Sequence, residues 1–310
     1  MVARRRGRGV RIKKIYNNSK YLNTKNIIRF FAKTPPSIVC PHFWELVWAI
    51  GCPFNCAYCY LRGTLYGRKE PRYKPLRSVL SALDRFFREQ KEPAILNSGE
   101  LSDSLMNPKI MRVIVDKFEE QDKHKILLVT KATNIQFLLE KVRKQTIVSF
   151  SISTPKVWKL WEHRTSSPID RIIAASRLAE VGYEVRIRID PIFPIGDWKE
   201  DYSDVVYEMF SRFTPERITL GTPRGLAKTL MFTEDRSWTY MLSKKTAWGK
   251  KLSDDLRFEI YTFFIELLGN LGFPIEKIAL CKEEVSMWRR IGLDPGHFPE
   301  WEKCRCNCVW

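Results

Sequence analysis

The chain has 310 residues, of which 44% are hydrophobic and 28% charged, and its formal net charge is +18 at pH 7. No apolar run approaches the roughly 20 residues that a membrane helix needs, and the start, MVARRRGRGVRIKK, has no apolar segment of signal-peptide type. We therefore expect a globular, cytoplasmic protein with a sizeable core. In that compartment, clustered cysteines bind metal or do chemistry more often than they form disulfides.

The positive charge is concentrated at the start of the chain. Residues 1–44 hold 11 Lys or Arg and no acid, so 42 of the 53 basic residues and all 35 acidic ones follow. Neutralising phosphates releases counterions, so a basic arm over residues 1–40 indicates a nucleic-acid partner. The 10 Trp, 11 Tyr and 18 Phe are available to stack on bases. A solvated tail and an organelle-targeting segment are the alternatives.

After the arm, short apolar runs alternate with longer amphipathic runs. Strands are predicted at 43–50, 93–100, 125–130, 146–153, 184–193 and 217–221, and helices near 75–90, 108–121, 134–142, 168–182 and 202–213. Buried strands joined by helices indicate a parallel sheet. They predict an open or partial barrel whose site lies at the carboxyl ends of the strands. The stretches NSGE, VTK, SIST and DPIF all fall at such ends.

The alternation ends near residue 222. Residues 222–253 form a basic, aromatic stretch, a long helix is predicted at 254–270, and the tail carries four more cysteines. We therefore predict three regions: a basic arm at 1–40, a partial barrel at 41–222 and a substrate-facing extension with a cysteine-rich tail at 223–310.

The stretch GCPFNCAYCYLRG, residues 51–63, holds Cys52, Cys56 and Cys59 in the spacing C-x3-C-x2-C. A structural zinc site needs four ligands, so three local cysteines leave it incomplete. A [4Fe–4S] cluster held by three thiolates has one iron free to bind a small ligand, which suits catalysis. The alternative is a zinc knuckle completed by a distant ligand.

This loop resembles that of the radical S-adenosylmethionine enzymes: C-x3-C-x2-C with Tyr58 before the third cysteine, after the first strand of a (β/α)6 pattern. The resemblance implies an α/β fold, a partial (β/α)6 barrel of radical SAM type. It also implies that the free iron chelates S-adenosylmethionine, and that electron transfer into the sulfonium yields a 5′-deoxyadenosyl radical. The radical abstracts hydrogen from substrate, while the protein supplies binding, orientation and exclusion of water.

Over about residues 45–220 the chain resembles one branch, the spore photoproduct lyase and DNA repair photolyase-like group. The matching stretches are CAYCYLRGTLYGRKEPRYK, LLVTKATNIQFLLE and the segment from VSFSIST through WEHRTSS to DPIFPIGDW. The match implies that Tyr58 and Tyr60 line the site, packing on adenine or relaying a radical. It places five residues at the cofactor: Ser98, Gly99, Glu100, Lys131 and Ser151. Spore photoproduct lyase carries a hydrogen-donating cysteine after its second strand. The corresponding stretch of this chain, LNSGELSDSLMNP, contains no cysteine.

Three other polar residues are candidates for the site, but each also has a structural interpretation. Asp190, at the mouth of the predicted barrel, contacts ribose or substrate, or caps the loop. His163 is an acid–base residue or makes a structural hydrogen bond. His124 is expected at the surface, where a strand starts.

The tail cysteines Cys304, Cys306 and Cys308 alternate, so an extended chain points all three to one side. With Cys281 they make four thiols, enough for a closed zinc or second iron–sulfur site. Cys40 is left over. Two alternatives remain: one tail thiol is a hydrogen donor or radical relay, or the thiols are unliganded.

The leading hypothesis is a radical S-adenosylmethionine enzyme, of lyase or base-modifying type, that acts on DNA or RNA. The expected partners are nucleic acid, held by the arm and residues 222–253, and an electron donor such as flavodoxin or ferredoxin. One rival keeps the cofactor and modifies a peptide or small metabolite, with the tail holding an auxiliary cluster. The other rival is a nucleic-acid-binding zinc protein without catalysis.

Overall fold

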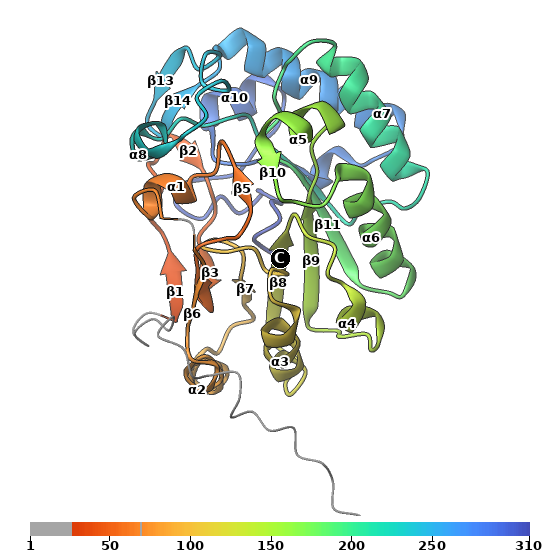
Figure 1. The fold of residues 1–310 in the computed structure, drawn as a ribbon. Coiled ribbons are helices and arrows are strands. Elements are labelled where there is room, and N and C mark those ends of the chain that lie inside the picture. Colours follow the sequence, from red (N-terminus) through yellow and green to blue (C-terminus); the bar gives the residue numbers. More distant parts are fainter. Residues whose placement is uncertain (1–26, 69) are drawn as a thin grey trace, which may run out of the picture.

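The computed structural model describes residues 27–68 and 70–310. Its centre is an eight-stranded sheet in the order β1-β3-β7-β8-β9-β11-β12-β15 (Figure 1). β1 runs antiparallel to β3, and every other neighbouring pair is parallel. The strands are β1 (Ile28–Phe31), β3 (Phe43–Leu46), β7 (Ile95–Asn97), β8 (Lys125–Thr130), β9 (Thr146–Ser151), β11 (Glu184–Ile189), β12 (Ile218–Leu220) and β15 (Ile278–Leu280).

Helices connect the parallel strands. They are α1 (Leu61–Thr64) and α2 (Leu76–Glu89), α3 (Pro108–Phe118), α4 (Gln136–Leu139), α5 (Pro155–Trp161) and α6 (Pro168–Glu180), α7 (Trp198–Phe210), and α8 (Ala227–Phe232) and α9 (Asp254–Asn270), with α10 (Val285–Arg290) at the end. α3, α5 and α6 start alike, with a proline at the first position after a side chain that caps a backbone N–H. Proline fits there because its missing N–H has no partner in the helix.

Four two-stranded pairs complete the fold. They are β4 (Ala49–Ile50) with β6 (Arg72–Tyr73), β5 (Asn55–Cys56) with β10 (Glu162–His163), β2 (Ile38–Val39) with β16 (Glu283–Glu284), and β13 (Lys244–Thr246) with β14 (Gly249–Lys251). None of the helices within the described ranges has the length and hydrophobicity of a membrane span.

The six predicted strands are confirmed, and they follow one another in the sheet in sequence order. Their carboxyl ends therefore lie along one edge, where the predicted motifs meet. Two strands were missed, β1 and β15, which add one strand at each side. Residues 28–40, assigned to the arm, form β1 and β2 and belong to the folded body, whereas residues 1–26 lie outside the described residues.

The last residues of the chain cover one face of the sheet, near β8 and β9 in Figure 1. Asn307 is fully buried: its amide donates to Ser149 Oγ and to Ile187 O, and its Oδ1 accepts from Thr219. Arg186 donates to the carbonyls of Asn307 and Val309. The tail thus satisfies polar groups of β9, β11 and β12 that would otherwise be buried without partners.

The prediction that His124 lies at the surface is wrong. Its side chain is fully buried, 5.2 Å from the ring centroid of Phe86 and stacked 5.7 Å from that of Phe87. Neither ring nitrogen has a hydrogen-bond partner. Burial lowers the pKa of this imidazole, because the charged form would lose its hydration.

Candidate active site

A cavity of about 590 Å³ opens at the carboxyl ends of the strands. Cys52, Cys56 and Cys59 all line it, so the structure brings the predicted trio to one wall. Most of the other predicted site residues line the same cavity: Tyr58, Tyr60, Gly99, Glu100, Lys131, Ser151, Asp190 and Cys281. Ser98 and the tail cysteines do not, and neither does His163, which is exposed on β10.

The cysteine loop is fixed by contacts with distant segments. β5 pairs with β10, so that Cys56 lies opposite Glu162. Arg62, buried in α1, donates to the carbonyl of Cys56 at 3.0 Å and to the side chain of Asn55 at 2.6 Å. Gly63 allows α1 to approach α8 closely, since a Cβ there would lie 2.5 Å from the backbone nitrogen of Thr229.

The three thiols are unpaired and suit an iron–sulfur cluster. None forms a disulfide, and burial raises the pKa of each, while the charge of Lys131 acts in the opposite direction on Cys56 and Cys59. A metal would provide the positive charge that thiolates need in such a place. In the described ranges, no three or more Cys, His, Asp or Glu side chains are close enough to hold one metal ion. A cubane receives its thiolates at separate corners, so the trio does not have to converge on one point.

Glu162 is a buried carboxylate that ties the loop to the sheet. It accepts from Lys131 Nζ at 3.0 Å, from Arg171 Nη2 at 2.6 Å and from the hydroxyl of Tyr58. Burial alone would raise the pKa of Glu162, but Lys131 and Arg171 lower it to about 2. Lys131 Nζ also lies 5.7 Å from the ring centroid of Tyr58. Tyr58 is therefore held by its hydroxyl and by its ring.

The NSGE turn follows β7. Asn97 accepts from Gly99 N at 2.9 Å and donates to Glu100 Oε1 at 3.0 Å, which positions Glu100 at the cavity. Tyr60 donates to the backbone carbonyl of Glu100. Ser98 was predicted to lie at the cofactor, but its side chain points away from the cavity. Its hydroxyl contacts Ser104 and the carbonyl of Leu127. This follows from strand alternation, which puts neighbouring side chains on opposite faces.

Gly99 is required by packing as well as by the site. An added Cβ would lie 2.5 Å from Val129 Cβ and 2.9 Å from Val129 O, on the neighbouring strand. The glycine therefore lets the turn lie against β8.

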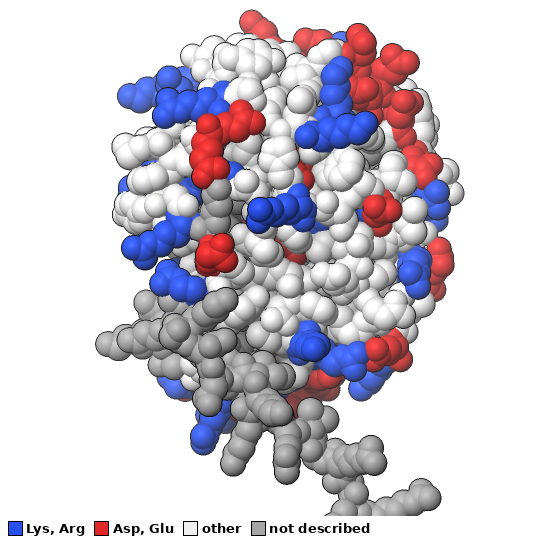
Figure 2. Space-filling model, viewed as in Figure 1, with Lys and Arg blue, Asp and Glu red and all other residues white. Residues whose placement is uncertain are grey.

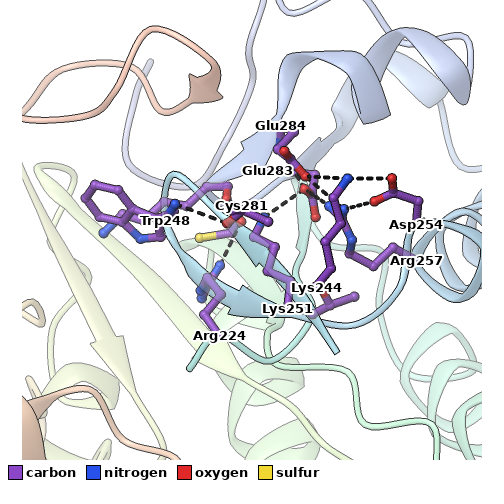
Figure 3. Close-up of polar contacts among 12 residues, drawn as sticks. Arg224, Lys244, Trp248, Lys251, Asp254, Arg257, Cys281, Glu283 and Glu284 are labelled. Carbon is purple, nitrogen blue, oxygen red and sulfur yellow. Dashed lines mark hydrogen bonds and ion pairs between the residues drawn. The ribbon is translucent and has the colours of Figure 1, made fainter. Parts of the chain in front are cut away.

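Asp190 is held by a cation that the sequence did not single out. Arg224 Nη2 donates to both oxygens of its carboxylate, at 2.8 and 2.9 Å, and Nη1 donates to the carbonyl of Cys281 at 2.7 Å. Burial would raise the pKa of Asp190, but Arg224 holds it below its usual value. Figure 3 shows Arg224 pointing to Cys281 at the end of β15. The loop-capping reading of Asp190 is thus compatible with this geometry, since both ends of the ion pair lie on loops.

The turn that carries Cys281 rests on a second buried carboxylate, Glu283. Lys251 donates to Glu283 at 2.7 Å and to the carbonyl of Lys282 at 2.9 Å, and Arg257 also pairs with Glu283 (Figure 3). Lys282 has a φ of +49°, which is rare for a bulky residue. The network of buried charges holds this backbone in place.

The family of the chain follows from its match to a family model. The model for spore photoproduct lyase matches residues 25–221, which include the whole cysteine loop and the strands β3 to β12. The chain belongs to the spore photoproduct lyase family.

Curated relatives agree with this assignment. Spore photoproduct lyase of Clostridium acetobutylicum is 29% identical over 171 residues, which are 53% of this chain and 50% of the relative. Spore photoproduct lyase of Bacillus subtilis is 25% identical over 196 residues, 60% of this chain and 56% of the relative. The match thus spans about half the length of these relatives.

Solved structures share the fold. Spore photoproduct lyase complexed with dinucleoside spore photoproduct superposes with a TM-score of 0.66 at 20% identity, covering 81% of this chain and 78% of that one. Streptococcus suis SuiB bound to precursor peptide SuiA gives a TM-score of 0.54 at 17% identity, covering 82% and 52%. The central parallel sheet is therefore common to the spore photoproduct lyase family and to SuiB.

The four thiols of the predicted second site lie in two different surroundings. Cys281 lines the cavity, whereas Cys304, Cys306 and Cys308 are buried with the tail against the sheet. Cys308 Sγ accepts from Arg188 Nη2 at 2.8 Å and from Asn97 Nδ2 at 3.5 Å. In the part of the chain described, no three of these thiols are close enough to hold one metal ion, and the second cluster stays a prediction.

Proposed function

We propose that this chain is a radical S-adenosylmethionine lyase that acts on damaged or modified nucleic acid. The observation that carries the proposal is the cavity in which three unpaired thiols share a wall with Glu100, Lys131 and Ser151. Membership of the spore photoproduct lyase family supports it. We also propose that the sheet is the partial (β/α)6 barrel of radical SAM enzymes, to which β1 and β15 are additions.

Each side chain then has a defined task. Cys52, Cys56 and Cys59 hold a [4Fe–4S] cluster, which with S-adenosylmethionine supplies hydrogen abstraction when both are bound. Glu100, already oriented by Asn97, accepts from the ammonium of the methionine moiety. Lys131 and Ser151 contact its polar groups at the ends of β8 and β9.

Other residues keep the site ordered and dry. Tyr58 is fixed between Glu162 and Lys131, and its ring centroid lies 5.2 Å from that of Phe193. It therefore forms part of the cavity wall next to the three cysteines. Tyr60 is 39% exposed and sits at the rim, held by Glu100. We infer that Tyr58 stays in place during turnover and that Tyr60 contacts the substrate.

Nucleic acid is favoured over peptide by the charge of the chain. Figure 2 shows acidic side chains gathered over α7, while Lys and Arg are spread over this face, several of them near α8 and β13. The exposed Lys245 and Lys250 stand directly opposite each other in the β13–β14 pair. Like charges in that arrangement are destabilising by themselves, so a polyanion that binds them offsets the cost.

The test is anaerobic reconstitution of the cluster, followed by its reduction in the presence of S-adenosylmethionine and deuterated oligonucleotides. These oligonucleotides carry spore photoproduct or other lesions. We expect 5′-deoxyadenosine to form and to gain deuterium from the oligonucleotide. Cys56→Ala should abolish both, whereas Cys40→Ala, at a buried cysteine outside the cavity, should not. Iron quantification distinguishes one cluster from two. Product formation that survives in Cys56→Ala would refute the assignment of the trio.

A further inference from the structure

Three cationic side chains on the cavity wall have no carboxylate within ion-pair distance in the described chain: the exposed Lys33, and Arg188 and Lys282, which lie deeper. Arg188 is 9% exposed; it donates to Cys308 Sγ, and its Nε has no hydrogen-bond partner. Lys282 Nζ lies 5.0 Å from the ring centroid of Phe31 and 5.4 Å from that of Trp248. A buried cation with an unused donor is costly unless an anion binds there.

The remaining charges of the cavity are mostly compensated. Arg29 pairs with Glu45, Arg224 with Asp190, and Lys131 with Glu162. Asp103 accepts from two backbone N–H groups and from Thr130.

Glu100 is the one lining carboxylate left to balance Arg188 and Lys282, and its charge acts on both. Under the proposed function, Glu100 faces the ammonium of the cofactor. With Glu100 so engaged, Arg188 and Lys282 form an uncompensated positive region.

We propose that Arg188 and Lys282 bind an internal phosphodiester of the nucleic-acid substrate, with an adjoining base stacked on Trp248. The inference rests on the proposed function and names the substrate group that its cavity receives. An arginine N–H and a lysine ammonium are the donors that phosphate oxygens commonly accept from. Trp248 lines the same cavity, and aromatic rings beside cations are typical of single-strand binding.

The position of Lys282 agrees with this role. Its backbone has a φ of +49° and is fixed by Lys251, which donates to its carbonyl. The adjoining carbonyl, of Cys281, accepts from Arg224 (Figure 3). Rare backbone conformations that the surroundings enforce occur often at ligand sites. Lys251 and Arg224 thus hold the turn that presents the Lys282 ammonium to the cavity.

The experiment measures binding to the reconstituted full-length chain by anaerobic equilibrium dialysis. The probes are thymidylyl-(3′→5′)-thymidine, its methylphosphonate analogue, which keeps both bases but has a neutral linkage, and S-adenosylmethionine. We expect the wild type to prefer the phosphodiester about tenfold, the ratio typical of one charge-assisted hydrogen bond. Lys282→Gln should remove this preference. Arg188→Lys, which keeps the charge but lacks Nε, should reduce it.

Lys109→Gln is the matched control, because it removes the charge of an exposed lysine on α3 that does not line the cavity. It should change each affinity by less than about twofold. Equal losses for both dinucleotides in Lys282→Gln would overturn the phosphate contact and leave stacking alone. A loss confined to S-adenosylmethionine would assign the cations to the cofactor's carboxylate instead.

Failure of the inference is distinguishable from failure of the proposed function. If the wild type forms 5′-deoxyadenosine on reduction but shows no preference for the phosphodiester, the subsite is wrong and the radical chemistry stands. If no 5′-deoxyadenosine forms from a chain that carries its cluster, the proposed function is wrong, whichever dinucleotide binds.

Discussion

Glu162→Gln would test the buried charge cluster that joins the cysteine loop to the sheet. The substitution keeps the shape of the side chain and removes its charge. Arg171, which is wholly buried, then loses its counter-ion, and Lys131 loses its carboxylate partner. The Tyr58 hydroxyl would keep an oxygen acceptor, so the change is mainly electrostatic.

The size of the effect follows from the pKa of Glu162, which falls from 4.5 to about 2 on folding. At roughly 1.4 kcal/mol for each pH unit, the charged form contributes about 3 kcal/mol to the free energy of unfolding. Breaking a buried ion pair costs about 3–5 kcal/mol by an independent measure. Since the folded pKa is the lower one, this contribution is complete above about pH 4.5 and is lost as the pH falls towards 2.

The assay is urea unfolding of wild type and variant at pH 7 and at pH 3. Glu162→Gln should lose about 3 kcal/mol at pH 7, and the difference from wild type should shrink at pH 3. Glu140→Gln removes an exposed partner of Arg112 and should cost less than about 1 kcal/mol. A difference that is under 1 kcal/mol at pH 7, or that stays constant down to pH 3, would contradict the reasoning.

Two further substitutions probe packing. Gly99→Ala places a Cβ 2.5 Å from Val129 Cβ, so urea unfolding should show a loss of about 1–3 kcal/mol; Gly269→Ala, in α9 with nothing within 4 Å, should be neutral or stabilising. Equal effects at the two glycines would argue against the clash. His124→Leu removes a buried imidazole whose pKa is lowered from 6.5. The wild type should lose up to about 1.4 kcal/mol per pH unit as the pH falls below 6.5, because only its unfolded state binds the proton, and the variant should lose less. Parallel pH curves for both proteins would show that His124 ionises freely in the folded state.

The sequence predicted the parts of the fold that depend on local pattern. The runs at 125–130 and 146–153 are apolar and long enough to be identified as strands, and the polar stretches after them identify the carboxyl edge of the sheet. β1 has four residues and β15 has three. Three residues of β1 are half-buried and one is exposed, so neither strand shows a strong hydrophobic pattern in the sequence. Their place in the sheet depends on pairing with β3 and β12, which sequence spacing does not report.

In the cavity wall, too, residues that are contiguous in the sequence could be predicted and residues from distant segments could not. The cysteine trio and the NSGE turn are contiguous, so they could be identified, but Arg188, Arg224 and Lys282 come from three separate segments. One indication was present: RIRID places Arg186 and Arg188 on one face of a strand that is otherwise buried. Two arginines on such a face imply acceptors there, which the tail carbonyls provide for Arg186.

The position of the tail has a consequence for the order in which the molecule assembles. Asn307 joins Ser149 and Thr219 across separations of 158 and 88 residues. Without residues 307–309, Ser149 and Thr219 lose their contacts with Asn307, and Arg186 keeps only Glu184. Contacts of such long range form slowly. We therefore expect the contacts of residues 307–309 with β9, β11 and β12 to be among the last to form during folding.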